Sequence, residues 1–288
     1  MASNPPRVLI VGHLTLDRFD DRVVPGGGVS YAARTAAALG ERLSILTCGG
    51  PDANIDALDG HDLRLVHAEA TLTFGFAGVN GQHKLRVLAR PQRRLTAADL
   101  PPGWERTRLV ILAPLLPDDI DLPSFADLPA PDGTAVLAQG LQRHLTQSSA
   151  VQSLSHPTSE LMDSCSRAVS VFLSEEETSN WPEEDFEALI HRAGRVIVTR
   201  GARGADIYAG SARPLHVDAH DVADVDATGA GDAFATAFML TLHEGDEAAA
   251  RVASAYAAAA VERSGPAPLP PLSRLLSRPA ASARVSSQ

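Results

Sequence analysis

Residues 224–234 read Asp224-Val225-Asp226-Ala227-Thr228-Gly229-Ala230-Gly231-Asp232-Ala233-Phe234, and this stretch decides the fold. The small residues at 228–231 let an anion approach the backbone closely, and the small and apolar residues after them predict a helix over about 230–243. The first N–H groups of a helix have no intrahelical partners, so they can bind a phosphate group. The stretch therefore predicts a phosphate site built from backbone amides, with Asp232 beside it in the first helical turn.

A carboxylate is not needed to bind phosphate and would repel it. Its presence at Asp232 makes sense if a hydroxyl must lose a proton while it attacks phosphorus. The alternative is an acidic residue that only complements the helix dipole. Asp226, Thr228 and the motifs described below favour the catalytic interpretation.

The basic residues exclude several lysine-dependent phosphate sites. Of the 25 lysine and arginine residues in the 288-residue chain, only Lys84 is a lysine, and it follows His83. A P-loop requires the pair Gly-Lys, and the protein-kinase signature requires a strand lysine, so both are excluded. If the protein handles phosphate, backbone amides and arginine must bind it.

Charge and cysteine content indicate the broad class. The net charge of −10 argues against an extended nucleic-acid surface. Cys48 and Cys165 are too few for a disulfide framework, and the ten histidines show no paired zinc spacing. We find neither a signal-peptide pattern nor an apolar run of about 20 residues, which a membrane-spanning helix needs. We therefore expect a cytoplasmic protein that contacts neither membrane nor nucleic acid.

Short apolar runs alternate with segments long enough for helices, which predicts a mainly parallel sheet with helices on both faces. The expected strands are 7–11, 43–47, 63–67, 71–79, 83–89, 108–112, 135–138, 169–173 and 195–199, with a late antiparallel addition at 204–209 and 215–217. The expected helices are 30–39, 230–243 and 246–263. Asn80-Gly81 predicts a hairpin turn. We expect one α/β domain over residues 1–265, with lid segments at about 13–25 and 70–92 and a partly disordered Pro/Ser/Arg-rich tail over 266–288.

The segment Asp226-Ala-Thr-Gly-Ala-Gly-Asp232 resembles the C-terminal signature of the ribokinase-like (PfkB) carbohydrate kinases, normally Asp-Thr-x-Gly-Ala-Gly-Asp, although Ala227 stands where the family often has Thr. The resemblance implies a three-layer α/β/α sandwich with a small β lid. It implies ATP as phosphoryl donor with Mg²⁺, and allows a monovalent cation such as K⁺. It also implies Asp232 as the catalytic base, with the amides of Gly229, Ala230 and Gly231 as the anion hole.

Three further motifs resemble the acceptor side of this family. The resemblance implies that Asp17, in Gly12-His-Leu-Thr-Leu-Asp17, holds acceptor hydroxyls, and that the backbone of Gly26 and Gly27 lies against the acceptor. Tyr31 stands where the family usually has Asn. Gln139-Gly-Leu-Gln-Arg143 is similar to the small inositol-type and archaeal-type members, so Gln139 and Arg143 are acceptor-site candidates; a surface salt bridge is the alternative for Arg143.

Two motifs resemble the donor side. Ser174-Glu-Glu-Glu177 corresponds to the family's Asn-x-x-Glu near Mg²⁺ and the phosphates, and it also predicts a capping box at a helix start. Thr199-Arg-Gly201-Ala-Arg-Gly204 resembles the turn that follows the nucleotide. Thr228 joins these residues as a cofactor candidate, and Glu177 and Asp226 are the metal candidates.

These features predict an ATP- and Mg²⁺-dependent phosphotransferase that acts in line on a hydroxyl of a sugar or polyol, inositol-like or ribose-like. A nucleoside kinase is one alternative, and it would need an aromatic sandwich for which Tyr31, Phe74 and Phe76 are the nearby candidates. A non-catalytic sensor is the other, because both family asparagines are replaced. The basic set Lys84, Arg86, Arg90, Arg93 and Arg94 could attract an anionic substrate, or could be a solvated strand face. We expect a monomer or homodimer.

Overall fold

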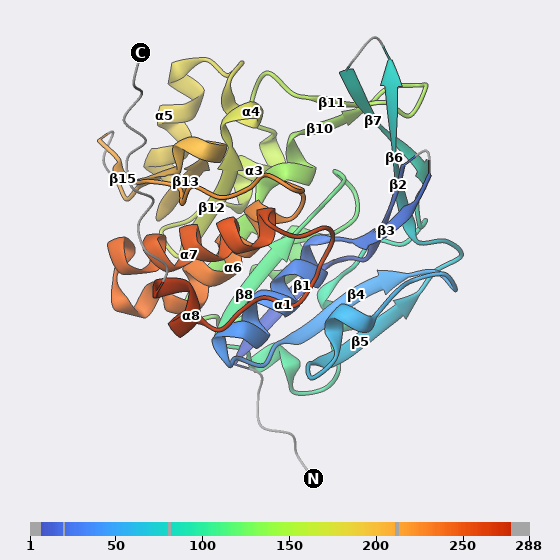
Figure 1. The fold of residues 1–288 in the computed structure, drawn as a ribbon, viewed down its shortest axis with the longest axis horizontal. Coiled ribbons are helices and arrows are strands. Elements are labelled where there is room, and N and C mark those ends of the chain that lie inside the picture. Colours follow the sequence, from blue (N-terminus) through green and yellow to red (C-terminus); the bar gives the residue numbers. More distant parts are fainter. Residues whose placement is uncertain (1–6, 20, 80–81, 211–212, 278–288) are drawn as a thin grey trace.

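The computed structural model describes residues 7–19, 21–79, 82–210 and 213–277, and within these ranges a nine-stranded sheet forms its centre (Figure 1). Strand β14 is antiparallel to both of its neighbours at one edge, and the other strand pairs are parallel. In order across the sheet, the strands are β15 (Leu215–Val217), β14 (Ala205–Tyr208), β13 (Arg195–Thr199), β12 (Val169–Ser174), β9 (Gly133–Leu137), β8 (Leu109–Ala113), β1 (Val8–His13), β4 (Ser44–Gly49) and β5 (Asp62–His67). The expected parallel sheet with a late antiparallel addition is confirmed.

The central strands are buried along their whole length. Every residue of β1, β4 and β8 is buried, as expected for near-continuous apolar runs covered on both faces. Strand β1 pairs with β4 on one side and with β8 on the other, so the chain changes direction across the sheet at this point. Ligands of open α/β sheets bind at the carboxyl ends of the strands beside such a switch point. His13 and Ala113 mark this place.

Helices cover both faces and give the expected three layers. One apolar core packs the first face under α1 (Gly28–Leu39), α6 (Ala230–Thr241), α7 (Asp246–Val261) and α8 (Leu272–Leu276). The other core lies under α2 (Leu122–Phe125), α3 (Ser159–Ser164) and α5 (Glu183–Arg192), while α4 (Glu175–Thr178) directly follows β12. Short 3₁₀ segments are η1 (Asp56–Leu58), η2 (Ala97–Asp99), η3 (Trp104–Arg106), η4 (Ala138–Gln142), η5 (Gly201–Arg203) and η6 (Leu242–Glu244). No helix in the described part of the chain is long and apolar enough to cross a membrane.

A second sheet stands beside the central one, at the upper right of Figure 1, and resembles a lid. Its described strands are, in order, β3 (Val23–Gly26), β2 (Thr15–Arg18), β6 (Leu72–Val79) and β7 (Gln82–Ala89). Strands β6 and β7 pair antiparallel, as a hairpin requires, although Asn80-Gly81 lies outside the described residues. A two-stranded ribbon, β10 (Arg143–Leu145) with β11 (Val151–Ser153), is linked to β7 through a hydrogen bond from Val87 N to Ser149 O of 2.9 Å.

Part of the expected tail is ordered. Residues 272–276 form α8, and Leu275 is buried in the core beneath α7. Residues 278–288 lie outside the described part of the chain. The division into one domain with two lid segments and a tail remains a prediction.

Candidate active site

The glycine turn before α6 and the start of α1 come together, because α1 and α6 pack side by side on the same face of the sheet (Figure 1). A Cβ on Gly28 would lie only 2.7 Å from Asp232 Oδ1, so the carboxylate rests directly on the Gly28 backbone. Both residues are in the first turns of their helices, where N–H groups lack intrahelical partners. Two positive helix ends therefore meet at Asp232.

At two further glycines, Gly26 and Gly229, a side chain also lies very close to the backbone. A Cβ on Gly26 would lie 2.9 Å from Asp17 Oδ2, and a Cβ on Gly229 would collide with the ring of Tyr31. Gly27 is the N-cap residue of α1, with φ of 94°. Asp17, Tyr31 and Asp232 are thus gathered around backbone that carries no side chain.

Burial raises the pKa values of the carboxyl groups of Asp232 and Asp17. It raises the pKa of Asp232 to about 7, with Arg143 opposing the shift and Glu177 adding to it. It also raises the pKa of Asp17 to about 6, with Asp226 adding to the shift and Arg143 opposing it. A carboxyl group with a pKa near neutrality is suited to proton transfer.

The positive charge of Arg143 acts on the carboxylates of both Asp17 and Asp232. Arg143 Nη1 donates a hydrogen bond of 2.9 Å to the Leu115 carbonyl oxygen, and its guanidinium lies 5.4 Å from the centre of the Phe74 ring. The charges of Asp17, Asp119, Glu177 and Asp232 all act on it; burial lowers the pKa of Arg143 and the four carboxylates oppose that shift. The surface salt bridge considered from the sequence is not formed within the described residues.

Tyr31 is only 5% exposed and lies among acidic groups. Burial raises its pKa well above the usual value, and the charges of Asp226, Asp17 and Asp232 add to the shift. The phenol is therefore a neutral hydrogen-bond donor. Its ring covers Gly229, the residue that precedes α6.

The predicted capping box at the start of α4 is confirmed. Ser174 N donates to Glu177 Oε2 at 2.7 Å, and Glu177 N donates to Ser174 Oγ at 3.3 Å. The charge of Glu177 nevertheless acts on both Arg143 and Asp232, so Glu177 lies near enough to influence the site. Burial raises its pKa, while the capping contacts and Arg143 oppose the shift.

Asp226 orders the glycine turn. Its Oδ1 accepts a hydrogen bond from Thr228 N at 3.0 Å, and its Oδ2 accepts one from Gly265 N at 3.4 Å. It thereby connects the turn to the segment after α7. Within the described residues, no group of three or more His, Cys, Asp or Glu side chains is arranged to hold a metal ion.

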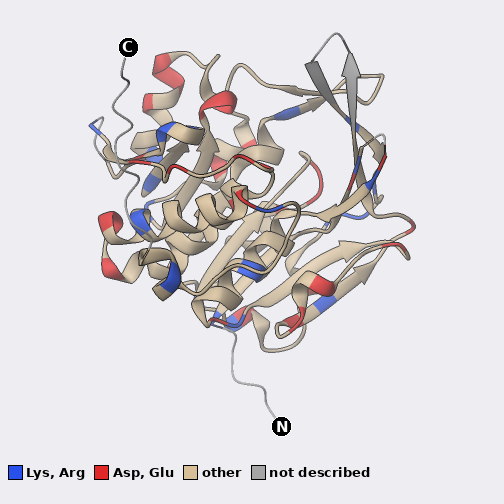
Figure 2. Cartoon of the chain, in the orientation of Figure 1, with Lys and Arg blue, Asp and Glu red and all other residues tan. Residues whose placement is uncertain are grey.

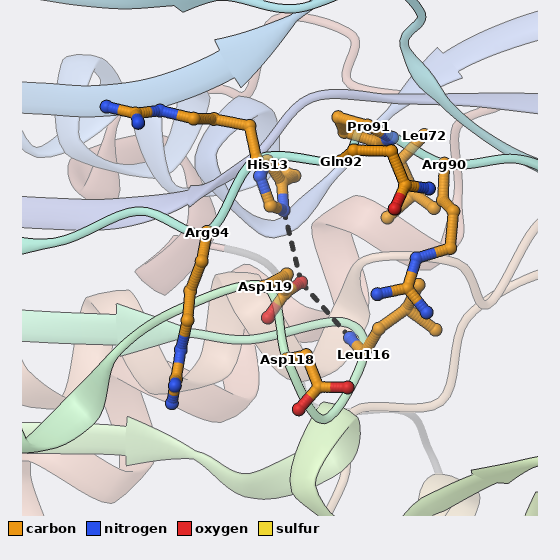
Figure 3. Close-up of a pocket in the computed structure, with 10 residues that line it drawn as sticks. His13, Leu72, Arg90, Pro91, Gln92, Arg94, Leu116, Asp118 and Asp119 are labelled. Atoms are coloured by element: carbon orange, nitrogen blue, oxygen red, sulfur yellow. Dashed lines mark hydrogen bonds and ion pairs between the residues drawn. The ribbon is translucent and has the colours of Figure 1, made fainter.

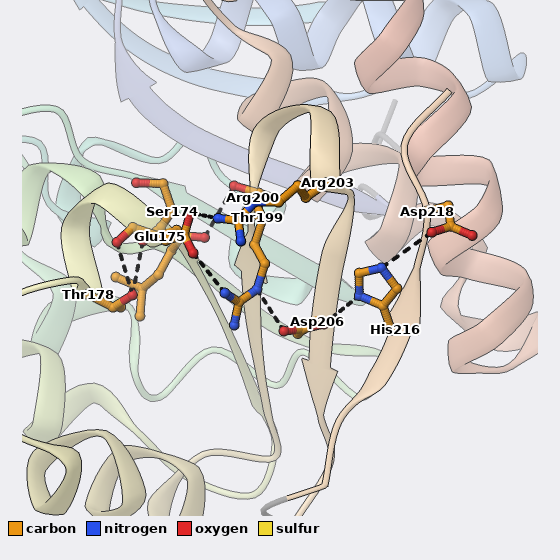
Figure 4. A network of polar contacts seen from close by, with 10 residues as sticks. Ser174, Glu175, Thr178, Thr199, Arg200, Arg203, Asp206, His216 and Asp218 are labelled. Atoms are coloured by element: carbon orange, nitrogen blue, oxygen red, sulfur yellow. Dashed lines mark hydrogen bonds and ion pairs between the residues drawn. The ribbon is translucent and has the colours of Figure 1, made fainter. Parts of the chain in front are cut away.

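The turn from Thr199 to Gly204 lies at the carboxyl end of β13 and is fixed by ion pairs (Figure 4). Glu175 binds both Arg200, at 2.8 Å, and Arg203. Gly201 and Gly204 have positive φ, and a Cβ on Gly204 would collide with the Val217 carbonyl oxygen. Thr199 Oγ1 donates to the Leu173 carbonyl oxygen at 3.4 Å, which connects this turn to the end of β12.

Not every sequence candidate joins the cluster. Gln139 is exposed at the start of η4. Arg93 pairs with Asp99, and Arg94 pairs with Asp121 and Glu160. The side chain of Lys84 lies outside the described residues.

Three groups near the site were not predicted from the sequence. Gly28 follows the predicted diglycine directly, so its position was a usable signal. Asp119 had no such signal, and the contacts of Asp119 and of the Leu115 carbonyl depend on how the loop after β8 folds.

Acidic and basic residues are interspersed over the elements drawn in Figure 2, but the segment between β15 and α6 is acidic. It carries Asp218, Asp221, Asp224 and Asp226. The glycine turn is therefore preceded by a negatively charged segment.

Known proteins share this fold. A pyrophosphate-dependent kinase of the ribokinase family, complexed with a pyrophosphate analogue and myo-inositol, matches with a TM-score of 0.74 at 16% identity, over 90% of this chain and 96% of that one. The ribokinase of Arabidopsis thaliana, complexed with ribose and ATP, matches with a TM-score of 0.67 at 20% identity, over 94% and 98%. The fold is therefore the ribokinase-like α/β sandwich.

Sequence comparison assigns the family. The bifunctional protein HldE of Nitrobacter winogradskyi is 43% identical over 74 residues, a stretch that makes up 25% of this chain and only 15% of that protein. A family model described as pfkB family carbohydrate kinase matches residues 127–272, just over half of the chain, including the donor-side segments and the glycine turn. The chain belongs to the pfkB family of carbohydrate kinases.

Proposed function

We propose that this kinase transfers a phosphoryl group from ATP to a hydroxyl of a sugar or polyol, with Asp232 as general base. The observation that carries the proposal is the position of Asp232. It lies in the first turn of α6 against the Gly28 backbone, with its pKa raised to about 7. A base of this pKa accepts a proton near neutral pH, and the adjacent amides stabilise negative charge on the transferred group.

The acceptor would lie between Asp17, Arg143 and Tyr31, with the Gly26-Gly27 backbone against it. Asp17 accepts hydrogen bonds from hydroxyls, while Arg143 and Tyr31 donate them. This mixture of donors and acceptors suits a polyhydroxylated molecule. A nucleoside base would need aromatic faces, but the Phe74 ring lies beneath Arg143 and the Tyr31 ring packs on Gly229.

The donor phosphates would bind at the amides of Gly229, Ala230 and Gly231, with Thr228 beside them. Thr199, Gly201, Gly204 and Ser174 would line the path of the nucleotide. Mg²⁺, when bound, would neutralise the phosphates, and the acidic segment before α6 favours such a cation. The described carboxylates fit Mg²⁺, which takes one or two carboxylates and completes its shell with phosphates and water.

Glu177 would hold Mg²⁺, because only one of its oxygens accepts the capping hydrogen bond from Ser174 N. Asp226 uses both carboxylate oxygens on backbone N–H groups, so loop ordering is its better-supported role. Binding of K⁺ and the oligomeric state, monomer or homodimer, remain predictions.

The test is a panel of sugars, polyols and nucleosides with two donors, ATP and pyrophosphate, in the presence of Mg²⁺. The second donor is included because one protein of the same fold is pyrophosphate-dependent. We expect phosphorylated product from ATP with a sugar or polyol. Transfer to nucleosides alone would overturn the acceptor assignment, and product from pyrophosphate alone would overturn the donor. Ligand binding without any transfer would favour the sensor.

A further inference from the structure

Behind the candidate acceptor site, His13 and Asp119 form a buried pair (Figure 3). His13 ends β1, and Asp119 lies in the loop after β8. His13 Nδ1 is 3.3 Å from Asp119 Oδ2, and the side chains are 1% and 5% exposed. The pair lines a cavity of about 220 Å³ at the base of the lid, where Leu72 begins β6.

Asp119 fixes the loop that follows β8. Its Oδ2 accepts hydrogen bonds from Leu115 N at 2.7 Å and from Leu116 N at 3.1 Å. The carbonyl oxygen of the same Leu115 accepts the hydrogen bond from Arg143 Nη1 at 2.9 Å. A short chain of contacts therefore runs from His13 through Asp119 and the Leu115 peptide to Arg143.

A second contact holds the loop after β8 against the segment that precedes Arg143. Gly140 N donates to the Pro114 carbonyl oxygen at 3.0 Å, and a Cβ on Gly140 would collide with that peptide. The loop after β8 and the η4 segment that leads into Arg143 are thus in direct backbone contact. A shift of the loop would be passed on to Arg143.

The pair is costly to bury, so its presence needs an explanation. Two buried charges generally stabilise a fold no better than apolar residues of similar size. Burial lowers the pKa of His13, but Asp119 and Cys48 outweigh that effect and raise it to about 9, so the imidazole is charged at neutral pH. Among the described residues, Asp119 Oδ1 and both ring nitrogens of His13 have no hydrogen-bond partner, so the pair is joined by charge at 3.3 Å.

We propose that His13 and Asp119 are positioning residues that hold Arg143 in the active site through the loop after β8. His13 neutralises Asp119 and orients it, and Asp119 holds the Leu115 peptide at the place where its carbonyl meets Arg143. The inference rests on the proposed function, in which Arg143 binds the acceptor and lies beside Asp232.

The test compares Asp119→Ala and His13→Gln with Asp118→Asn, a matched control. Asp118 lines the same cavity but is exposed and makes no contact with the loop amides. We expect the first two variants to raise the acceptor KM about tenfold or more, because small displacements in an active site are costly. They should also move the acidic limb of the pH–rate profile to higher pH, since Arg143 opposes the upward pKa shift of Asp232.

A double-mutant cycle separates positioning from a merely structural role. If Asp119 acts through Arg143, then Asp119→Ala changes kcat/KM by less than about twofold when Arg143 is already Ala. Equal losses in both backgrounds, or a fall in kcat with an unchanged acceptor KM and pH profile, would overturn the proposal. Asp119→Asn, which keeps the shape of the side chain, provides a second variant if Asp119→Ala does not fold.

A measurement that does not depend on activity distinguishes failure of the positioning role from failure of the proposed function. The ¹⁵Nε signal of Arg143, assigned by its loss in Arg143→Ala, should shift in Asp119→Asn and stay in place in Asp118→Asn. An unmoved signal would overturn the positioning role whether or not the protein is active. A wild-type protein without transfer activity would overturn the proposed function alone.

Discussion

At the scale of single residues, the candidate site depends on one carboxylate that is neither free in solvent nor neutralised by a close ion pair. Asp232 rests on the Gly28 backbone, and Arg143 acts on it at longer range. A closer cation would lower its pKa and weaken it as a base. The balance of burial and distant charge keeps its pKa near neutrality.

The pH dependence of activity follows from this balance. Only the ionised form of Asp232 accepts a proton, so kcat/KM should fall as the pH drops below about 7. The measurement is a pH–rate profile at subsaturating acceptor. Asp17→Asn is the control: it should raise the acceptor KM and leave the acidic limb in place. A flat profile from pH 6 to 8 would contradict the role of Asp232.

The same raised pKa has a cost for stability. A folded-state pKa above the unfolded value means that the folded state binds more protons, so stability is lost as pH rises from the unfolded pKa through the folded one. Asp232→Asn removes this cost, so the variant should be more stable than the wild type at pH 8, by a few kcal/mol at most since one pKa unit is worth about 1.4 kcal/mol.

Urea unfolding at pH 5.5, 7 and 8.5 measures this effect. The advantage of Asp232→Asn should shrink as the pH falls. Asp118→Asn, an exposed change, should stay within about 0.5 kcal/mol of the wild type throughout. A variant that is equally or less stable than the wild type at pH 8.5 would show that Asp232 is not destabilised by burial.

At the scale of elements, the start of α1 supports Asp232 because Gly28 has no side chain. A Cβ there would meet Asp232 Oδ1 at 2.7 Å and the Cβ of Ala113 at 3.2 Å. The backbone contact and the position of the carboxylate therefore depend on each other. Adding one methyl group at residue 28, as in Gly28→Ala, tests whether the position of Asp232 depends on this backbone contact.

Gly28→Ala should displace Asp232 and lower kcat about tenfold or more while the protein stays folded. The matched control is Ala37→Gly, which lies at an exposed position of the same helix. It should cost about 1 kcal/mol of stability through helix propensity and leave kcat unchanged. Equal kcat values for Gly28→Ala and the wild type would disprove the proposed dependence of Asp232 on the close packing of α1.

Local elements could be predicted from the sequence, and contacts between distant elements could not. The capping box of Ser174 and Glu177 follows from a three-residue spacing, and the end of α1 follows from Gly40, whose φ is 77°. The contacts of Gly28 with Asp232 and of Asp119 with Leu115 depend on how α1, α6 and the loops pack. Residue spacing in the sequence does not predict these contacts, because they join segments far apart in the chain. Gln139 is exposed in η4, and its role in the acceptor site stays a prediction.

At the scale of the whole molecule, the sheet order brings the parts of the site to one edge. The strand order reverses between β1 and β8, and the carboxyl ends of β1, β8, β9 and β12 face the lid sheet and the starts of α1 and α6 (Figure 1). The apolar runs predicted this sheet because buried parallel strands are nearly continuous in hydrophobicity. Segments 13–25 and 70–92 were expected to form a lid, but the parallel pairing of β2 with β6 was not predicted, because residue pattern does not record which separated strands pair.

We propose that Asp232 takes the acceptor proton during transfer from ATP to a sugar or polyol. The most direct test measures turnover of wild-type protein and Asp232→Asn on the best acceptor of the panel, with Asp118→Asn as a control for surface charge. We predict that Asp232→Asn loses at least about a hundredfold in kcat, within the range that general-base catalysis supplies, while acceptor binding and the activity of the control are retained. Equal turnover by Asp232→Asn and the wild type would contradict the account.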